Sequence, residues 1–298
     1  MTESARKFHS GFVTIVGRPN VGKSSLMNRI IGEKIAIVSS RPQTTRNRIM
    51  GVFSEKEDQI VFLDTPGIHD PRSKLGEYMM QSVQDSLNGM DILMVILDAS
   101  HITANDLSTA KSLLEQKVPV ILVLNKIDLV TPDKVLSATA SAAEIGYEEI
   151  VPVSAKTGDG IDELVCILKK HLPEGPQYFP DDMITDQPER VLCTEIIREK
   201  ALRHLHDEVP HGIGVEIMKI EAFSDSLTEI NATLYCERDA HKRIIIGKQG
   251  SMLQTIGSEA RMDIEKLLGV HINLKLWVKV RPDWRNNKSD LKSLGYHS

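Results

Sequence analysis

Short apolar runs alternate with helix-like stretches along the first 170 residues of the chain. Runs of strand length lie at residues 12–16, 60–63, 92–97, 118–124 and 151–153. Stretches with apolar residues at helical spacing lie at residues 23–31, 75–87, 104–116 and 161–171. Strands that alternate with helices predict an α/β fold with a doubly wound sheet, which binds ligands beyond the carboxyl ends of its strands.

A stretch with four prolines, residues 172–188, marks a change of pattern. We therefore expect one domain over residues 1–174, a linker over 175–189, and a second domain with a polar C-terminal tail over 190–298. The second domain is predicted to run in the order α-β-β-α-α-β. Its elements are expected at residues 191–206, 214–223, 229–236, 240–268 with a break at 247–250, and 272–280.

Composition and charge narrow the class of protein. Hydrophobic residues make up 41% and charged residues 26% of the chain, and no apolar run approaches the ~20 residues that cross a bilayer. The N-terminus has no apolar signal segment, and three widely spaced cysteines indicate reduced thiols in the cytosol. From Cys236 onward 12 basic residues face 7 acidic ones, which favours an anionic partner for this part.

A phosphate-binding motif follows the first predicted strand. Residues 17–24 match G-x-x-x-x-G-K-[ST] between a strand and a helix, the context that this motif requires. Its backbone N–H groups and the helix N-terminus can surround phosphate oxygens, with Lys23 at the β- and γ-phosphates and Ser24 on Mg²⁺. The nucleotide-binding segment is expected to comprise Gly17, Arg18, Pro19, Asn20, Val21, Gly22, Lys23, Ser24 and Ser25.

Three further motifs follow later strands. Asp64-Thr65-Pro66-Gly67 offers a carboxylate for Mg²⁺, through water, and the Gly67 N–H for the γ-phosphate. In Asn125-Lys126-Ile127-Asp128, the carboxylate can accept two hydrogen bonds from guanine, whereas adenine offers no such pair of donors. Ser154-Ala155-Lys156 is expected to aim a backbone N–H at guanine O6.

These motifs, in this order, resemble the translation-factor-like class of Ras-like GTPases over residues 10–172. The resemblance implies a threonine that closes on Mg²⁺; we favour Thr45 and keep Thr44 as the alternative. Ile68 stands where Ras-type enzymes carry the glutamine that positions water, so slow intrinsic hydrolysis is expected. In related GTPases without the glutamine, asparagine at the position of Asn20 helps to hold potassium. The expected catalytic residues are therefore Lys23, Thr45 and Asn20.

The second domain carries a G-x-x-G turn, Gly247-Lys248-Gln249-Gly250, between two helical stretches. Such a turn lets a nucleic-acid backbone approach closely, and basic residues lie just upstream of it. Together with the predicted element order, it resembles an α+β type II KH domain. The expected RNA-binding residues are Arg238, Lys242, Arg243, Gly247, Lys248, Gln249 and Gly250.

A Ras-like GTPase domain joined to one KH domain resembles the Era family of bacterial ribosome-assembly GTPases. The resemblance implies GTP and GDP as ligands, Mg²⁺ and K⁺ as cofactors, and small-subunit (30S) ribosomal RNA, near the 16S 3′ end, as partner. It also implies a cytoplasmic monomer with peripheral contact to the inner membrane. Two alternatives stay open: an RNA-binding scaffold in which GTP is mainly structural, and an ATP-driven motor, which residues 125–128 disfavour.

Overall fold

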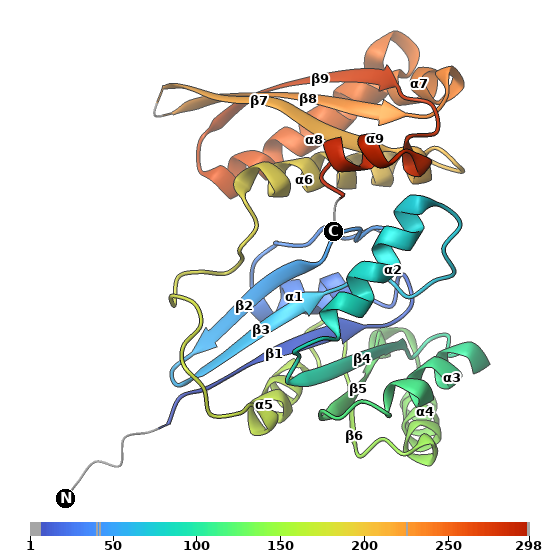
Figure 1. Ribbon diagram of the computed structural model, residues 1–298, viewed down its shortest axis with the longest axis vertical. Coiled ribbons are helices and arrows are strands. Elements are labelled where there is room, and N and C mark those ends of the chain that lie inside the picture. Colours follow the sequence, from blue (N-terminus) through green and yellow to red (C-terminus); the bar gives the residue numbers. More distant parts are fainter. Residues whose placement is uncertain (1–6, 40, 42, 225, 297–298) are drawn as a thin grey trace, which may run out of the picture. The chain divides into compact units, whose positions relative to one another are not determined.

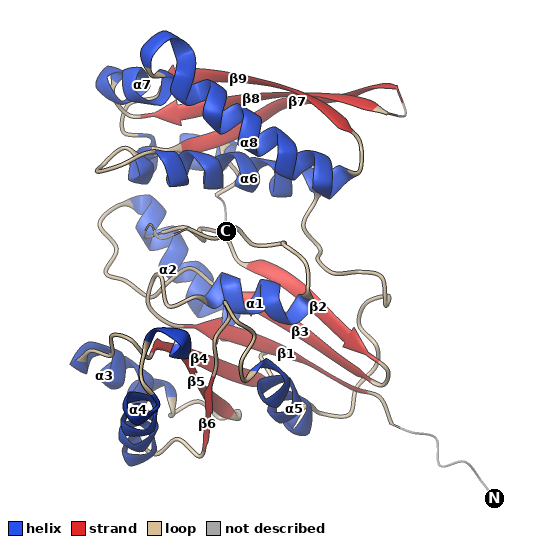
Figure 2. Cartoon of the chain, turned by 180° about the vertical axis from the view of Figure 1, so that it is seen from behind, coloured by secondary structure: helices blue, strands red, loops and turns tan. Residues whose placement is uncertain are grey.

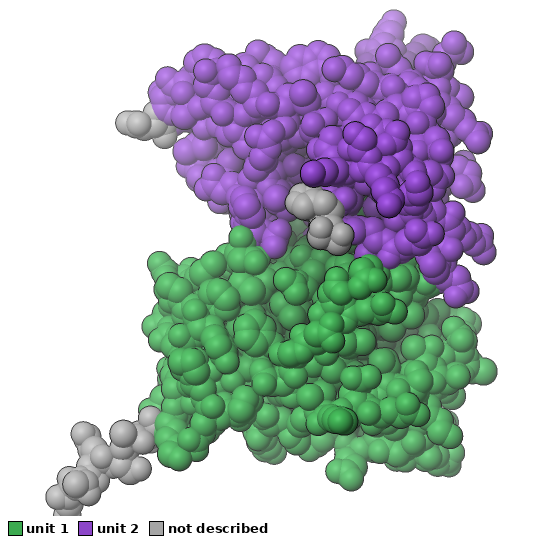
Figure 3. All heavy atoms as spheres, viewed as in Figure 1, with its two compact units in different colours: residues 1–36, 45–69, 79–186 green, residues 37–44, 70–78, 187–298 purple. Residues whose placement is uncertain are grey.

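The computed structural model describes residues 7–39, 41, 43–224 and 226–296. These residues form two compact units, coloured separately in Figure 3. Unit 1 comprises residues 1–36, 45–69 and 79–186, and unit 2 comprises residues 37–44, 70–78 and 187–298. Two short segments from the N-terminal half of the chain therefore fold with the C-terminal unit.

Unit 1 is built on a six-stranded sheet (Figure 1). Its strand order is β2-β3-β1-β4-β5-β6, and every neighbouring pair is parallel except β2 and β3. The strands are β1 (His9–Val16), β2 (Ile49–Glu55), β3 (Asp58–Asp64), β4 (Ile92–Asp98), β5 (Val120–Asn125) and β6 (Glu149–Pro152). The predicted doubly wound α/β fold is confirmed.

Helices cover both faces of this sheet because its central strands are apolar on both sides. In β4, Ile92, Met94 and Ile96 pack on one face, while the residues between them pack on the other. Helices α1 and α5 supply the first core, and α2, α3 and α4 contribute to the second. The helices are α1 (Lys23–Ile31), α2 (Lys74–Ser86), α3 (Ala104–Leu113), α4 (Pro132–Ile145) and α5 (Ile161–His171).

The sequence pattern did not predict two elements of unit 1, β2 and α4. Strand β2 lies at the sheet edge, contains Gly51 and forms an antiparallel hairpin with β3, so it lacks the long apolar run of the central strands. Helix α4 buries only Ala142 and therefore carries no wide apolar stripe. A short 3-10 helix, Ile127–Leu129, precedes α4.

Unit 2 has the predicted order α-β-β-α-α-β. Strands β7 and β8 are antiparallel, β8 and β9 are parallel, and α6 and α8 lie against one face of this sheet (Figure 2). A core of apolar residues from all these elements joins the helices to the sheet. The elements are α6 (Glu189–His204), β7 (Gly214–Ser224), β8 (Leu227–Cys236), α7 (Asp239–Ile246), α8 (Ser251–Leu268) and β9 (His271–Val280).

The C-terminal segment, expected to be a polar tail, is instead folded into unit 2. It contains a short 3-10 turn (Trp284–Asn286) and α9 (Lys288–Ser293). Trp284 is fully buried and donates its indole N–H to the Gly212 carbonyl at 2.9 Å. Leu291 and Tyr296 are also buried, but the polar residues between these anchors hide the pattern. Within the described part of the chain, no helix is both long and apolar enough to span a membrane.

One glycine of unit 1 is fixed by a close approach of the backbone. Gly160 precedes α5 with φ 72°, and a Cβ there would lie 2.2 Å from the Pro152 carbonyl oxygen. Gly89 has φ 73° but nothing within 4 Å. We expect Gly89→Ala to cost about 1–2 kcal/mol of unfolding free energy, because of its left-handed backbone. Gly160→Ala should cost about 1–3 kcal/mol more, because of the added clash.

Urea unfolding of the two variants, followed by a probe of unit 1, measures this difference. Because the two glycines have nearly the same positive φ, 72° and 73°, the strain of positive φ cancels in the comparison. Equal losses of stability in the two variants would show that the contact with Pro152 does not fix Gly160.

Candidate functional site

The phosphate loop connects β1 to α1 at the carboxyl end of the sheet, and its shape requires small residues. A Cβ on Gly17 would lie 2.5 Å from the Ile96 carbonyl oxygen, and one on Gly22 would lie 2.3 Å from Asn125 Nδ2. Asn20 takes up a left-handed conformation, with φ 65°. The loop therefore bends tightly at three points before α1 begins with Lys23.

Lys23 is buried beneath this loop. Its ammonium donates to the carbonyl oxygens of Gly17 and Arg18, at 3.0 and 3.1 Å. Burial lowers the pKa of Lys23 to about 8, although the charge of Asp64 partly opposes the shift. A buried ammonium at a helix N-terminus is a strong attractor for phosphate, which would also restore its ordinary pKa.

Asp64, at the end of β3, meets two hydroxyl groups. Its Oδ2 accepts from Ser24 Oγ at 2.5 Å and from Thr45 Oγ1 at 3.5 Å, and the two hydroxyl oxygens are 2.9 Å apart. The Thr44 hydroxyl instead donates to the Arg41 carbonyl, at 2.6 Å, in unit 2. Of the two threonines that the sequence left open, only Thr45 joins this oxygen cluster.

The donor set around Asp64 fits a magnesium ion. The carboxylate is fully buried, and its Oδ1 has no hydrogen-bond partner among the described residues. Burial raises the pKa of Asp64 to about 6, although Lys23 and the two hydroxyl groups partly oppose the shift. Mg²⁺ prefers oxygen ligands and commonly takes one or two from protein together with phosphate oxygens.

The loop after Asp64 lies directly against the phosphate loop. The Ile68 N–H donates to the Gly17 carbonyl at 3.0 Å, and a Cβ on Gly67 would lie 2.6 Å from the Pro19 nitrogen. The Thr65 hydroxyl anchors the strand end by donating to the Ile15 carbonyl at 2.7 Å, and Pro66 is buried. Only glycine, which has no Cβ, therefore lets the two loops approach this closely at position 67.

A third group of residues forms the base side of the site. Asn125 donates from Nδ2 to the Val21 carbonyl at 2.8 Å and accepts at Oδ1 from the Ala155 N–H at 3.1 Å. Ser154 Oγ donates to Asp128 Oδ1 at 2.7 Å. The loops after β5 and β6 are thus tied to the phosphate loop, and Asp128 keeps its second oxygen for further donors.

Lys126 shows a partner that the sequence analysis missed. Its ammonium donates to the Asn20 carbonyl at 2.7 Å and to Asp98 Oδ2 at 2.6 Å. Burial alone would raise the pKa of Asp98, but hydrogen bonds from Lys126 and Ser100 hold it below its ordinary value. The signal was available, because Asp98 ends β4 as Asp64 ends β3.

The remaining predicted nucleotide residues lie at the margin of this site. The Arg18 side chain turns toward α3, where it donates to the His101 carbonyl at 2.5 Å and lies 3.2 Å from Asp106 Oδ1. Ser25 is half-buried in the first turn of α1, and Lys156 is exposed. Only the backbone of Arg18 therefore belongs to the phosphate loop itself.

In unit 2, the predicted G-x-x-G turn joins α7 to α8 through left-handed backbone. Gly247, Gln249 and Gly250 have φ of 73°, 52° and 81°. A Cβ on Gly247 would lie 2.7 Å from Met252 Cβ, whereas Gly250 has nothing within 4 Å. The turn leaves Lys248 and Gln249 exposed.

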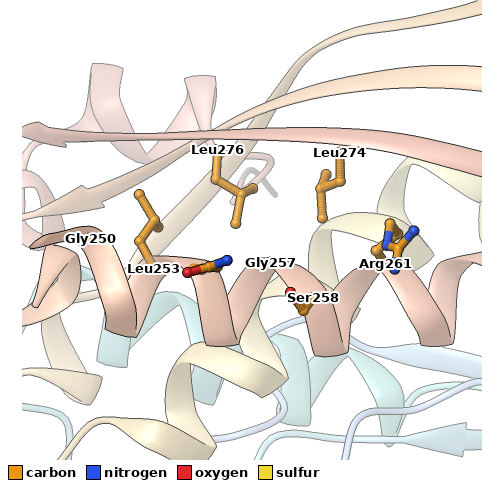
Figure 4. Close-up of a pocket in the computed structure, with 8 residues that line it drawn as sticks. Gly250, Leu253, Gly257, Ser258, Arg261, Leu274 and Leu276 are labelled. Carbon is orange, nitrogen blue, oxygen red and sulfur yellow. The ribbon is translucent and has the colours of Figure 1, made fainter.

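A groove of about 360 Å³ begins at this turn and lies between α8 and β9 (Figure 4). Leu253, Leu274 and Leu276 make its walls apolar, and Gly257 keeps α8 free of a side chain opposite Leu276. Its polar groups come from Gln254, Ser258 and Arg261. Sequence reasoning missed these lining residues, although a glycine inside a helix is a signal of close approach. The predicted Arg238, Lys242 and Arg243 do not line the groove.

Comparisons with known proteins agree with this division. Residues 12–126 match the family described as 50S ribosome-binding GTPase, and residues 208–285 match the KH domain. A GTPase Era of Ruminiclostridium cellulolyticum is 50% identical over 291 residues, which cover 97% of this chain and 98% of the relative. A GTPase Era of Clostridioides difficile is 52% identical over 294 residues, covering 97% and 99%.

Solved structures give the same result for the whole chain. The structure of Era with MgGDPNP and nucleotides 1506–1542 of 16S ribosomal RNA is 40% identical, with a TM-score of 0.94, and the match covers 98% of this chain and all of that one. A point variant of Aquifex aeolicus Era bound to GDP·AlF4⁻ matches with a TM-score of 0.93, at the same identity and coverage. The chain belongs to the Era family of GTPases and carries that family's KH domain.

Proposed function

We propose that this GTPase is a switch that binds the 3′ region of small-subunit ribosomal RNA and acts in assembly of the 30S subunit. The observation that carries the proposal is that one chain combines a phosphate loop, a base side on which Ser154 orients Asp128, and a groove that begins at the G-x-x-G turn. The related Era structure with MgGDPNP and 16S ribosomal RNA supports it. Family membership also supports a cytoplasmic monomer with peripheral membrane contact.

The geometry suggests a role for each nucleotide-site residue. Lys23 and the loop N–H groups would neutralise the phosphates, and the Gly67 N–H would reach the γ-phosphate. Ser24, Thr45 and Asp64 would hold Mg²⁺, which supplies positive charge against the phosphate oxygens when bound. Asp128 would select guanine, oriented by Ser154, while the stem of Lys126 would cover the base.

Hydrolysis needs a group other than Ile68, whose aliphatic side chain cannot orient water. We propose that Asn20 helps to hold K⁺ against the phosphates, where the ion takes the place of an arginine finger. Support comes from the position of Asn20 in the left-handed bend of the loop, fixed through its carbonyl by Lys126. The left-handed backbone and the bond to its carbonyl would together set the direction of the Asn20 side chain.

The KH groove would hold single-stranded RNA. Bases would enter the apolar groove between α8 and β9, while the backbone would pass over the G-x-x-G turn. Lys248 and the upstream Arg238, Lys242 and Arg243 would then meet phosphates outside the groove.

The RNA site can be tested at Gly250. Gly250→Asp places a negative charge at the turn without a clash, and we expect roughly tenfold weaker binding of an RNA that spans the 16S 3′ end, because like charges repel. Gly269→Asp is the matched control, since Gly269 follows the other end of α8 with φ 70° and nothing within 4 Å. Filter binding measures both. Unchanged RNA affinity in Gly250→Asp, or an equal loss in the control, would exclude the proposed RNA path.

The magnesium site can be tested through pH. Because Asp64 has a pKa of about 6 without nucleotide, a proton competes with Mg²⁺ below that pH. The Mg²⁺ affinity of the GDP complex should fall roughly fourfold more between pH 7.5 and 5.5 in the natural chain than in Asp64→Asn. Titration of a fluorescent GDP complex with Mg²⁺ measures this, and the variant corrects for protonation of the nucleotide. An equal fall in Mg²⁺ affinity between pH 7.5 and 5.5 in both proteins would exclude Asp64 as the ligand.

The potassium proposal predicts faster GTP turnover in K⁺ than in Na⁺, by about tenfold or more, still small beside the 10³–10⁵ of an arginine finger. Asn20→Gly should reduce this difference, because glycine keeps the left-handed backbone and removes the side chain. Phosphate release in matched K⁺ and Na⁺ buffers measures GTP turnover for the natural chain and for the variant. Equal turnover in the two ions for the natural chain would rule out a role for potassium.

A further inference from the structure

The Arg18 side chain leaves the phosphate loop and binds the start of α3. Its Nη2 donates to the His101 carbonyl oxygen at 2.5 Å, and its Nε lies 3.2 Å from Asp106 Oδ1. The phosphate loop and α3 both belong to unit 1. One side chain of the loop thus bridges two elements of the same unit.

The Asp106 carboxylate that receives Arg18 is held in a fixed direction. Its Oδ2 accepts from the backbone N–H and from the hydroxyl of Thr103, both at 2.8 Å, and the Asp106 N–H donates back to Thr103 Oγ1 at 3.2 Å. This capping box begins α3 and leaves Oδ1 for Arg18. The Asp106 side chain is only 6% exposed, and a charge buried to that extent is costly without a partner. Arg18 therefore compensates a charge that is already fixed in place.

The backbone of Arg18 contacts the phosphate site directly. Its carbonyl oxygen accepts from Lys23 Nζ at 3.1 Å and, with that of Gly17, holds the ammonium beneath the loop. Pro19 follows, with a φ fixed by its ring, and the loop then bends at Asn20. A shift of Arg18 would therefore reach the Lys23 ammonium through a single hydrogen bond.

Packing alone does not fix the phosphate loop against α3. A cavity of about 40 Å³ is lined by residues of both elements, among them Gly17 of the loop and Leu113 of α3. Side chains that face a cavity lose van der Waals contacts there. Arg18 and Asp106 also line this cavity, so their charged bridge joins the loop to α3 where apolar contacts are missing.

We propose that Arg18 is a positioning residue of the GTPase site, which holds the phosphate loop through Asp106 so that the Lys23 ammonium meets the β-phosphate. This inference rests on the proposed role of Lys23. Arg18 acts without touching a phosphate, because its guanidinium is bound at α3. The share of nucleotide affinity that comes from the β-phosphate therefore depends on Asp106, a residue outside the phosphate-binding motif.

The test compares the preference for GDP over GMP in variants of the full chain, by competition with a fluorescent GDP in EDTA. We expect Arg18→Met to lower this preference roughly tenfold with GMP affinity unchanged, because a misplaced ammonium loses part of its charge-assisted hydrogen bond to the β-phosphate. A purely structural role would lower both affinities together. Lys111→Met is the control, since it removes the same charge from an exposed position on α3, and it should bind as the natural chain does.

Two further variants separate the bridge from misfolding. Arg18→Met leaves the Asp106 carboxylate unpaired, whereas Arg18→Met combined with Asp106→Asn leaves no charge at the bridge. Asp106→Asn alone should also lower the preference for GDP. The double variant should lose less than the two single losses multiplied, since both changes break one bridge. An undiminished preference in Asp106→Asn would refute the bridge.

Lys23→Met distinguishes failure of this inference from failure of the proposed function. If Lys23→Met lowers the preference for GDP and the Arg18 variants do not, the role of Arg18 is refuted while the proposed function stands. If Lys23→Met keeps the full preference, the proposed phosphate site is wrong.

Discussion

Burial of two opposite charges, Lys23 and Asp64, is the constraint on which the nucleotide site depends. Strands β1 and β3 are parallel neighbours with Ile15 opposite Asp64, so the loops that follow both strands start at the same sheet edge. Burial moves both pKa values toward neutrality, to about 8 for the lysine and about 6 for the aspartate. On the proposed function, phosphate beside Lys23 and a cation beside Asp64 would together compensate the two buried charges.

The backbone around this pair is shaped by close approach. Gly67 lies against Pro19, and Gly17 lies against the Ile96 carbonyl, at distances that no Cβ tolerates. These contacts bring the phosphate loop and the loop after Asp64 together. Residues 70–78, which follow that second loop, fold with unit 2, where the Lys74 N–H donates to Asn286 Oδ1 at 3.2 Å and Tyr78 packs edge-on against Tyr296.

Much of the fold was predictable because motif and pattern agreed. Helices α1 and α5 were predicted at their observed bounds, and the G-x-x-G turn falls between α7 and α8 as expected.

The sequence did not predict features that have no local signal in the chain. Arg198, Glu199 and Lys200 look like a solvated stretch of helix, yet all three are buried, because tertiary partners compensate their charges. The groove beside α8 depends on how β9 packs against that helix, which no sequence period encodes. The choice between Thr44 and Thr45 likewise required the path of the backbone, which directs only the second hydroxyl to Asp64.

The most direct measurement is the titration of the Asp64 carboxyl carbon by NMR, in the full chain with and without Mg²⁺-GDP. In the nucleotide-free protein the pKa should lie near 6, since burial outweighs the favourable interactions with Lys23 and the hydroxyl groups. With Mg²⁺-GDP bound, the carboxylate should stay ionised throughout that range, because the metal competes with the proton. A pKa below about 4 in both states, which is the ordinary value of an exposed aspartate, would contradict the account.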